Sequence, residues 1–532
     1  MLPTLVTAAA LPALALAAFS SIDKDLGNGV HVPGAVPANS LEPLQHRLAY
    51  AGTDGMTVSW STFAKLDAPQ VRYGFRPDNL EFTANSTESL TYPTSRTYSN
   101  HVKLKGLKPG TKYYYQVSHT NIGSSAYLPT YTFTTARAPG DETPYTAAIF
   151  ADLGLMGQDG LSTRHGPFGG SDLAVLDVNE TNTIQSLLAL KDTYDLMIHA
   201  GDIGYFDSFL QEASQGYFGI DNATTQPTRE QVAEHYESMS EQFFDQMRPI
   251  TAEKPWMVSP GNHEANCVEG VTTDKRANIT YTDDYCLPGQ VNFTLFKTHY
   301  KMPSDESGGR GNYWYSYDNG LAHYISLQTE TDLGSDLVGP IEDANGPFGR
   351  PNEQIDWLKA DLAAVDRTLT PWVVVLLHRP WYTSISPPTW PAWQEAFEQI
   401  FYDNEVDVYF QGHVHTYERF VPMFNGTVDP KGYDDPRAPW PVILGNAGHY
   451  DGLEAFDGPE RYNGTAFATD REYGFTRLTF HNRTHATLEA IAARNSSVFD
   501  SQTIFKSHDF DKENNGNGKR PDGDMRCGKF RC

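Results

Sequence analysis

Seven side chains of the kinds that bind metal ions stand in five short blocks of this 532-residue chain. They are Asp152, Asp202, Tyr205, Asn262, His378, His413 and His415. Each block after the first begins within, or directly after, an apolar run that reads as a strand. Because a mononuclear site needs only three or four protein ligands, seven oxygen and nitrogen donors suggest two metal ions that share one bridging carboxylate. A pair of ions held in this way is suited to hydrolysis.

The five blocks also carry a resemblance to a known family. They are Ala-Asp-Leu-Gly (151–154), Gly-Asp-Ile-Gly-Tyr (201–205), Gly-Asn-His-Glu (261–264), Val-Leu-Leu-His (375–378) and Gly-His-Val-His (412–415). In this order they resemble the purple acid phosphatases of the metallophosphoesterase superfamily, from about residue 145 to 450. Each block alone has an ordinary interpretation: Asp152 or Asp202 could be a helix N-cap, and His413 with His415 could be a packed pair. Five blocks in order favour the metal centre.

The resemblance implies a division of the ligands between two metals. The first metal would be bound by Asp152, Tyr205 and His415, the second by Asn262, His378 and His413, and Asp202 would bridge the two. Phenolate and carboxylate are hard anionic donors that suit a trivalent ion, whereas imidazole and amide oxygen suit a divalent one. The expected pair is therefore Fe(III) with Zn(II), Fe(II) or Mn(II).

The first block departs from the commonest metallophosphoesterase pattern. Many members have Asp-x-His there, but this chain has Asp152-Leu153-Gly154. A ligand must therefore come from elsewhere, and Tyr205, three residues after Asp202, is placed to supply it. Charge transfer from tyrosinate to Fe(III) would colour the protein purple.

The expected reaction is hydrolysis of phosphate monoesters by a metal-activated hydroxide, so no serine or cysteine nucleophile is needed. His263 is the candidate proton donor and, with Asn262, a candidate substrate contact; the alternative is that His263 only orients the site through hydrogen bonds. Arg379 is a candidate substrate contact and Tyr382 a candidate for the substrate mouth, with a structural role for either left open. Plant relatives carry a His-His pair after the fourth block, where this chain has 386–389 (Ser-Pro-Pro-Thr), so the leaving-group acid stays open. Glu418 and Arg419 are expected to pair with each other.

Two domains are expected to position these residues. Residues 145–510 alternate strand-like runs, at 145–151, 194–200, 254–259, 321–327, 371–377, 405–411 and 441–445, with helical patterns at 229–248 and 352–366. This predicts an α/β domain with parallel strand pairs, and the resemblance implies an αββα sandwich. Donors at the carboxyl ends of such strands converge on one edge.

The N-terminal part is expected to be a separate β-sandwich. Residues 31–137 hold short β-rich runs separated by turns, a pattern that resembles a fibronectin type III module. The run at 113–115 (Tyr-Tyr-Tyr) is interpreted as sandwich core rather than as a binding strip. Residues 511–532 are interpreted as a polar tail.

Several features indicate passage through a secretory pathway to the extracellular space or the cell wall. Residues 1–20 read as a signal peptide, the alternative being a buried N-terminal helix. Nine Asn-x-Ser/Thr sequons follow: Asn85, Asn179, Asn222, Asn278, Asn292, Asn425, Asn463, Asn482 and Asn495. The four cysteines allow three pairings, of which Cys267 with Cys286 and Cys527 with Cys532 are expected.

The net charge of −26 argues against nucleic acid as a partner, because the chain has no basic excess with which to release counterions. No run after residue 20 is long and apolar enough for a membrane span.

Small phosphorylated molecules are the expected substrates, and a homodimer remains open. We therefore expect a secreted acid phosphatase, with phytate among the candidate substrates. The alternatives are a phosphodiesterase or nucleotide pyrophosphatase on the same metal core, and a non-catalytic glycoprotein that binds metal or phosphate.

Overall fold

The structure is a computed structural model that describes residues 24–25, 31–32, 37, 39–119, 128–155, 176, 180–208, 227–268, 272–274, 278–330, 349–385, 391–448, 452–456 and 458–508. The expected signal segment, the polar tail and the bridge between Cys527 and Cys532 lie outside these residues, as do Asn179, Asn222 and the segment 386–389. A two-stranded ribbon, β1 (Lys24–Asp25) with β2 (His31–Val32), precedes the first domain.

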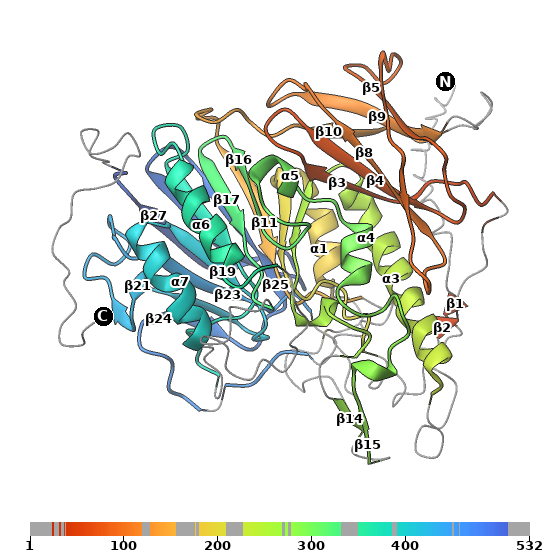
Figure 1. Ribbon diagram of the computed structural model, residues 1–532. Coiled ribbons are helices and arrows are strands. Elements are labelled where there is room, and N and C mark those ends of the chain that lie inside the picture. The colour runs from red at the N-terminus through yellow and green to blue at the C-terminus, as the bar shows by residue number, and fades with distance from the viewer. Residues whose placement is uncertain are drawn as a thin grey trace, which may run out of the picture.

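The N-terminal module is a sandwich of two antiparallel sheets, as expected (Figure 1). One sheet has the order β3 (Leu44–Tyr50), β4 (Met56–Thr62), β8 (Tyr98–Leu104), β7 (Glu88–Leu90). The other has the order β10 (Tyr131–Thr134), β9 (Lys112–His119), β5 (Pro69–Gly74), β6 (Phe82–Asn85). Along β9, Tyr113, Tyr115 and Val117 alternate with more exposed residues and are buried in the core. This confirms the core interpretation of Tyr113 and Tyr115.

The second domain contains two mixed sheets. The first has the order β13 (Trp256–Ser259), β12 (Leu196–Ala200), β11 (Tyr145–Phe150), β25 (Gly474–Phe480), β26 (His485–Ala492), β27 (Val498–Phe505). The second has the order β16 (Tyr315–Asn319), β17 (Ala322–Ser326), β18 (Trp372–Leu376), β19 (Val408–Gln411), β23 (Trp440–Leu444), β20 (Tyr417–Phe420), β24 (Thr465–Thr469). β11, β12 and β13 are parallel, as are β17, β18, β19 and β23.

Side-chain alternation in the second sheet divides the core into two layers. Val374 and Leu376 of β18 belong to the hydrophobic cluster shared with the first sheet. Val373 and Val375 belong instead to a cluster with the helices α6 (Glu353–Ala364) and α7 (Pro391–Asp403). These helices cover the outer face of the second sheet (Figure 1). Because strand residues alternate between faces, one apolar strand can serve both layers.

Helices also cover the first sheet. α1 (Thr183–Ala189) packs against α3 (Arg229–Thr251) and β25. α3 contributes Phe243, whose ring lies 6.1 Å from that of Trp256 in β13. The helix begins at a capping box in which the Thr228 side chain accepts from the backbone N–H of Gln231. The strands and helices expected from the sequence are confirmed, and they form two sheets with covering helices behind a β-module.

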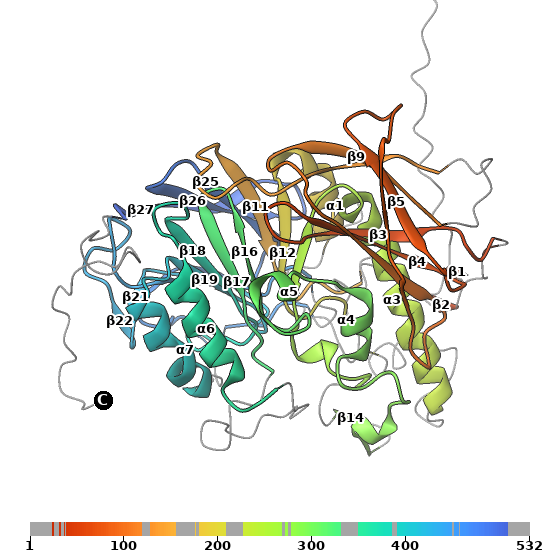
Figure 2. The ribbon, with the colours of Figure 1, turned by 45° about the horizontal axis from the view of Figure 1, so that its top comes forward.

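The two parts of the chain share a packed interface between β3 and α3 (Figure 2). The Arg47 guanidinium lies 4.6 Å from the ring centre of Phe244 on α3. The Tyr92 hydroxyl donates to Glu237 at 2.6 Å, and the Tyr115 hydroxyl donates to the carbonyl of Ala252 at 2.7 Å. The module is therefore docked on the helix through apolar and polar contacts together.

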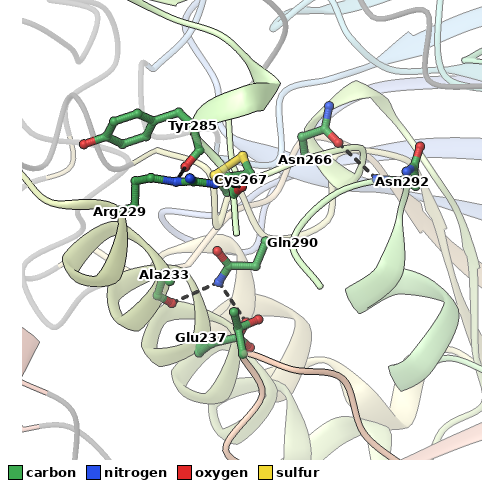
Figure 3. The surroundings of a disulfide bond; sticks show 10 residues. Arg229, Ala233, Glu237, Asn266, Cys267, Tyr285, Gln290 and Asn292 are labelled. Atoms are coloured by element: carbon green, nitrogen blue, oxygen red, sulfur yellow. Dashed lines mark hydrogen bonds between the residues drawn. A yellow bond between two sulfur atoms is a disulfide. The ribbon is translucent and has the colours of Figure 1, made fainter. Parts of the chain in front are cut away.

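Cys267 and Cys286 form a disulfide, which confirms one of the two expected bridges (Figure 3). It lies in the connection that also carries β14 (Thr272–Asp274), β15 (Ile279–Tyr281), α4 (Thr294–His299) and α5 (Ser304–Ser307). Arg229 at the start of α3 donates to the carbonyls of Tyr285 and Cys286, at 2.8 and 2.6 Å. The bridge closes a loop within this connection, and the Arg229 hydrogen bonds hold that loop against α3. The remaining short strands are β21 (Met423–Phe424) and β22 (Thr427–Val428).

Among the described residues, no helix combines the length and the apolar character needed to cross a membrane.

Candidate metal centre

Loops that follow the parallel strands bring the expected donors to one edge of the two sheets. Asp152 follows β11, Asp202 follows β12 and Asn262 follows β13, whereas His378 follows β18 and His413 follows β19. Asp152, Asp202 and His413 have left-handed backbones with φ of 59°, 49° and 68°. Non-glycine residues seldom adopt this conformation, and it is concentrated at functional sites. The chain therefore turns sharply where each of these donors leaves its strand.

Two glycines of the blocks lie so close to neighbouring donor residues that a side chain would not fit. A Cβ on Gly201, whose φ is 86°, would lie 2.4 Å from Nδ1 of His378. A Cβ on Gly261 would lie 2.2 Å from Oδ1 of Asp202. Neither position has room for a side chain, so the motifs need glycine before the donor residue.

One group of donors surrounds the Tyr205 hydroxyl. Its oxygen lies 2.9 Å from Oδ1 of Asp152, 3.1 Å from Oδ2 of Asp202 and 3.2 Å from Nε2 of His415. All four residues are buried. Two carboxylates, a phenol and an imidazole therefore meet at one point.

A second group surrounds Oδ1 of Asn262. This oxygen lies 3.0 Å from Nε2 of His378 and 2.8 Å from Nδ1 of His413. Oδ2 of Asp202 lies 3.0 Å from the same nitrogen of His378. Ligand atoms of Asp202, His378 and His413 all fall within 4.8 Å of one another, which is compatible with a bound metal ion.

The spacing and chemistry of both groups fit metal ions. Around a six-coordinate ion with bonds of about 2.1 Å, neighbouring donors lie about 3 Å apart, as these donors do. Oδ2 of Asp202 belongs to both groups, since it contacts Tyr205 and His378 at 3.1 and 3.0 Å. The donor set also matches the preference of a hard ion for the first group and of a softer divalent ion for the second.

The electrostatics favour the ligand forms of two donors. Burial opposes ionisation of Asp202, but His378 and His263 outweigh it and hold the pKa of Asp202 well below its ordinary value. Burial and the charge of Arg379 lower the pKa of His413, which stays neutral. Burial acts to lower the pKa of His378, but Asp202 outweighs it and raises that pKa to about 9. A metal ion that binds Nε2 of His378 would therefore displace a proton.

Glu264 holds two of the blocks together. Its carboxylate accepts from the backbone N–H groups of Gly261 at 2.7 Å, Asp202 at 3.0 Å and Ile203 at 2.7 Å. The third block therefore supplies the partner for the backbone that carries Asp202. Sequence reasoning gave Glu264 no role, although it lies within the Gly-Asn-His-Glu block.

His263 lies beside both donor groups. Its Nδ1 is 2.8 Å from Oδ2 of Asp207, and its Nε2 is 3.9 Å from Oδ2 of Asp202. Its ring centre is 4.2 Å from that of Tyr205. A carboxylate behind Nδ1 directs Nε2 toward the centre, and Asp207, which sequence reasoning missed, supplies that carboxylate.

Arg379 and Tyr382 each pair with a carboxylate. The Arg379 guanidinium is forked onto the buried carboxylate of Glu330, with Nε 2.8 Å from Oε1 and Nη2 2.7 Å from Oε2. Tyr382 is buried in the cluster with α7, where its hydroxyl pairs with Glu398. Both side chains therefore have structural partners, and a contact of either with substrate stays a prediction.

The expected pair of Glu418 with Arg419 is wrong. Both residues lie on β20, where neighbours in sequence point to opposite faces. Glu418 accepts from the backbone N–H of Ser384 at 2.8 Å, and Arg419 is forked onto Asp500 at 2.6 and 2.8 Å.

Three family models match this chain. "Purple acid Phosphatase, N-terminal domain" matches residues 43–135, "Calcineurin-like phosphoesterase" matches 146–417, and "Iron/zinc purple acid phosphatase-like protein C" matches 438–501. The matches follow the order and approximate limits of the β-module, the two sheets and the C-terminal strands.

Whole-chain relatives give the same result. Acid phosphatase A of Cryphonectria parasitica is 34% identical over 94% of this chain and 97% of its own length. An acid phosphatase of Aspergillus ficuum is 31% identical over 90% of this chain and 91% of its own length. A solved purple acid phosphatase from yellow lupin seeds shares the fold, with a TM-score of 0.65 at 22% identity over 92% of this chain and 79% of the lupin chain. The chain therefore belongs to the purple acid phosphatase family, and it is a metallophosphoesterase hydrolase.

Proposed function

We propose that the seven converging side chains bind two metal ions and that the protein hydrolyses phosphate monoesters at this centre. The observation that carries the proposal is the shared position of Asp202. Its Oδ2 contacts Tyr205 of one donor group and His378 of the other. The expected ligand division follows: Asp152, Tyr205 and His415 on an Fe(III), Asn262, His378 and His413 on a Zn(II), Fe(II) or Mn(II), and Asp202 on both.

When bound, two such ions supply an activated water and neutralise charge on the phosphoryl oxygens. The protein's own side chains have the remaining tasks. Nε2 of His263 faces the centre and is placed to donate a proton or to bind a phosphoryl oxygen, while Asp207 fixes the ring. The Asn262 amide lies beside it and is the second proposed substrate contact. Arg379 is not carried into this role, because its guanidinium is forked onto Glu330.

The proposal includes secretion as a glycoprotein with a cleaved signal at 1–20. Seven of the nine sequon asparagines lie among the described residues, and all seven are exposed: Asn85, Asn278, Asn292, Asn425, Asn463, Asn482 and Asn495. Exposure is what attachment of a glycan requires. The disulfide between Cys267 and Cys286 fits the same oxidising route. The domain limits 31–137 and 145–510 are part of this proposal.

Two measurements on the purified protein test the proposal. Metal analysis with a visible spectrum should find two metals per chain, one of them iron, and a purple charge-transfer band. A colourless protein with two divalent ions would remove the Fe(III) assignment, and a protein that takes up no metal would remove the centre. Comparison of kcat/KM for a phosphate monoester, its diester analogue and phytate then separates a monoesterase from a phosphodiesterase or nucleotide pyrophosphatase.

A further inference from the structure

The three proposed histidine ligands differ in what lies behind the ring nitrogen that faces away from the centre. Nδ1 of His378 lies 3.0 Å from the backbone carbonyl of Ala200. Nδ1 of His415 lies 3.7 Å from the carboxylate of Glu454. Both follow the usual pattern, in which an acceptor orients a metal-binding imidazole. Behind the His413 ring, Nε2 lies 3.5 Å from Nη1 of Arg379, so a guanidinium packs against this imidazole.

This cation is held rigidly. Nε of Arg379 contacts both carboxylate oxygens of Glu330, at 2.8 and 3.0 Å, and Nη2 contacts Oε2 at 2.7 Å. The two side chains are almost fully buried, at 4% and 0% exposure. A planar guanidinium that makes parallel hydrogen bonds to a carboxylate is held in one orientation. Because the pair is buried, water does not replace these hydrogen bonds.

The backbone around the pair links three neighbouring strands. The N–H of Arg379, which follows β18, donates to Oγ1 of Thr329, which follows β17, at 3.0 Å. The side chain of Gln411, the last residue of β19, donates to the carbonyl of Arg379 at 3.2 Å. The backbone of Arg379 is therefore held by the ends of β17 and β19, and β18 and β19 precede His378 and His413 of the second donor group.

We propose that Glu330 and Arg379 are positioning residues for His413. The guanidinium edge restrains the ring at Nε2 and so keeps Nδ1 directed toward Oδ1 of Asn262, 2.8 Å away. When Nδ1 binds a metal ion, Nε2 carries the proton, and the restraint is then steric, because two N–H groups do not hydrogen-bond to each other. The inference rests on the proposed function, because it concerns a ligand of the second metal.

The pairing also explains how a cation can lie next to a metal centre. Glu330 cancels the charge of Arg379, so that the pair restrains His413 without adding net positive charge beside a divalent ion. Loss of Glu330 alone leaves the guanidinium unpaired and buried, which disfavours both folding and metal binding. Loss of the fork while a positive charge remains, as in Arg379→Lys, tests geometry apart from charge.

The test compares four proteins: the wild type, Arg379→Lys, Glu330→Gln with Arg379→Met, and Arg419→Lys. Arg419 is the matched control, because it is likewise buried and forked onto a carboxylate, that of Asp500, away from the donor groups. The double variant removes both buried charges together and keeps the test valid if a single variant does not fold. For each protein, the divalent metal retained is measured by elemental analysis after dialysis against graded chelator. Thermal unfolding, kcat and KM are measured on the same samples.

We expect Arg379→Lys and the double variant to bind the divalent metal about ten- to a hundredfold more weakly while iron stays bound. Excess metal should restore kcat, with KM unchanged. Arg419→Lys should lose thermal stability and keep the metal affinity of the wild type. Wild-type metal affinity in both Arg379 variants would overturn the inference. A rise in KM would then indicate that Arg379 contacts substrate, and a fall in thermal stability alone would indicate a purely structural role. A wild-type protein that binds no divalent metal would instead refute the proposed function.

Discussion

Tyr205 reaches Asp202 across a turn in which both residues have left-handed backbones, with φ of 50° and 49°. The turn places the Tyr205 hydroxyl 3.1 Å from Oδ2 of Asp202, although the two residues are only three positions apart. A regular strand would carry the phenol roughly 10 Å away from Asp202. The left-handed turn therefore places the phenol at the proposed ligand position, which a histidine of the first block is expected to supply in many metallophosphoesterases.

Replacement of Tyr205 by phenylalanine should remove the proposed purple colour without unfolding the protein. The ring is buried and stays packed against His263, 4.2 Å between centres, while the donor oxygen is lost. The visible spectrum should lose its charge-transfer band, and the iron content should fall. Tyr315→Phe is the control, because Tyr315 is likewise buried and its hydroxyl donates to the carbonyl of Val258. A band that survives in Tyr205→Phe would contradict the ligand assignment.

Asp202→Ala and His378→Ala should each abolish turnover while the fold is retained. The proposed metal ions would contribute several kcal/mol of transition-state stabilisation. Their loss should therefore lower kcat/KM by about a thousandfold or more. Circular dichroism checks the fold, and elemental analysis checks the metals. Turnover near the wild-type value in either variant would refute the proposed centre.

Glu264→Gln should weaken both the fold and the metal centre. The carboxylate accepts three backbone N–H bonds, and an amide of the same shape replaces one acceptor oxygen with a donor. We expect a loss of about 1–3 kcal/mol in unfolding free energy, together with weaker metal retention. Denaturant titration with and without added metal measures both effects. Unchanged stability would show that the three bonds are not needed to hold the loops.

Glu237 should make the protein less stable above neutral pH. Burial raises its pKa from 4.5 to about 7 in the folded protein. A group whose folded pKa is raised contributes stability that is present in full below pH 4.5 and is lost as the pH rises through about 7. Glu237→Gln keeps a neutral side chain at every pH, so its unfolding free energy should lack this fall, which amounts to about 3 kcal/mol.

The measurement is the unfolding midpoint from pH 4 to 8.5 for the wild type, Glu237→Gln and Glu234→Gln. Glu234 lies on the same helix and is exposed, so its variant should follow the wild-type curve. A curve for Glu237→Gln that falls as steeply as the wild type would show that Glu237 does not carry the dependence.

The Cys267–Cys286 disulfide should stabilise the protein by about 3 kcal/mol, since it closes a loop of sequence separation 19. The double variant Cys267→Ser with Cys286→Ser should therefore unfold at lower denaturant. Because the bridge lies beside the Arg229 contacts rather than within the donor groups, kcat should change little. A variant of full stability would mean that contacts to α3 alone hold this connection (Figure 3).

The donors and their strands could be predicted because the relevant signals are local. Asp152, Asp202, Asn262, His378 and His413 each follow a buried apolar run, and parallel strands end at a common edge. The helices at 229–248 and 352–366 were predicted within a few residues of α3 and α6, since their apolar periodicity is clear.

The supporting residues could not be predicted in the same way. Glu330 and Asp207 are isolated carboxylates in sequence, and each acquires its partner only when strands and loops distant in sequence come together. Arg379 was expected at the substrate because it follows His378. Its pairing with Glu330 depends on the ends of β17 and β18 lying side by side, which the position of Arg379 in the sequence does not reveal.

The interface between β3 and α3 also limits how this chain can be rearranged. A fragment that began after the N-terminal module would expose the Phe244 ring that Arg47 covers, and it would remove the partner of the Ala252 carbonyl. The module alone would expose the opposite half of the same surface. A truncation or fusion made at the boundary between the two parts therefore leaves apolar surface uncovered on each fragment, so we expect a stable expression product to contain both parts.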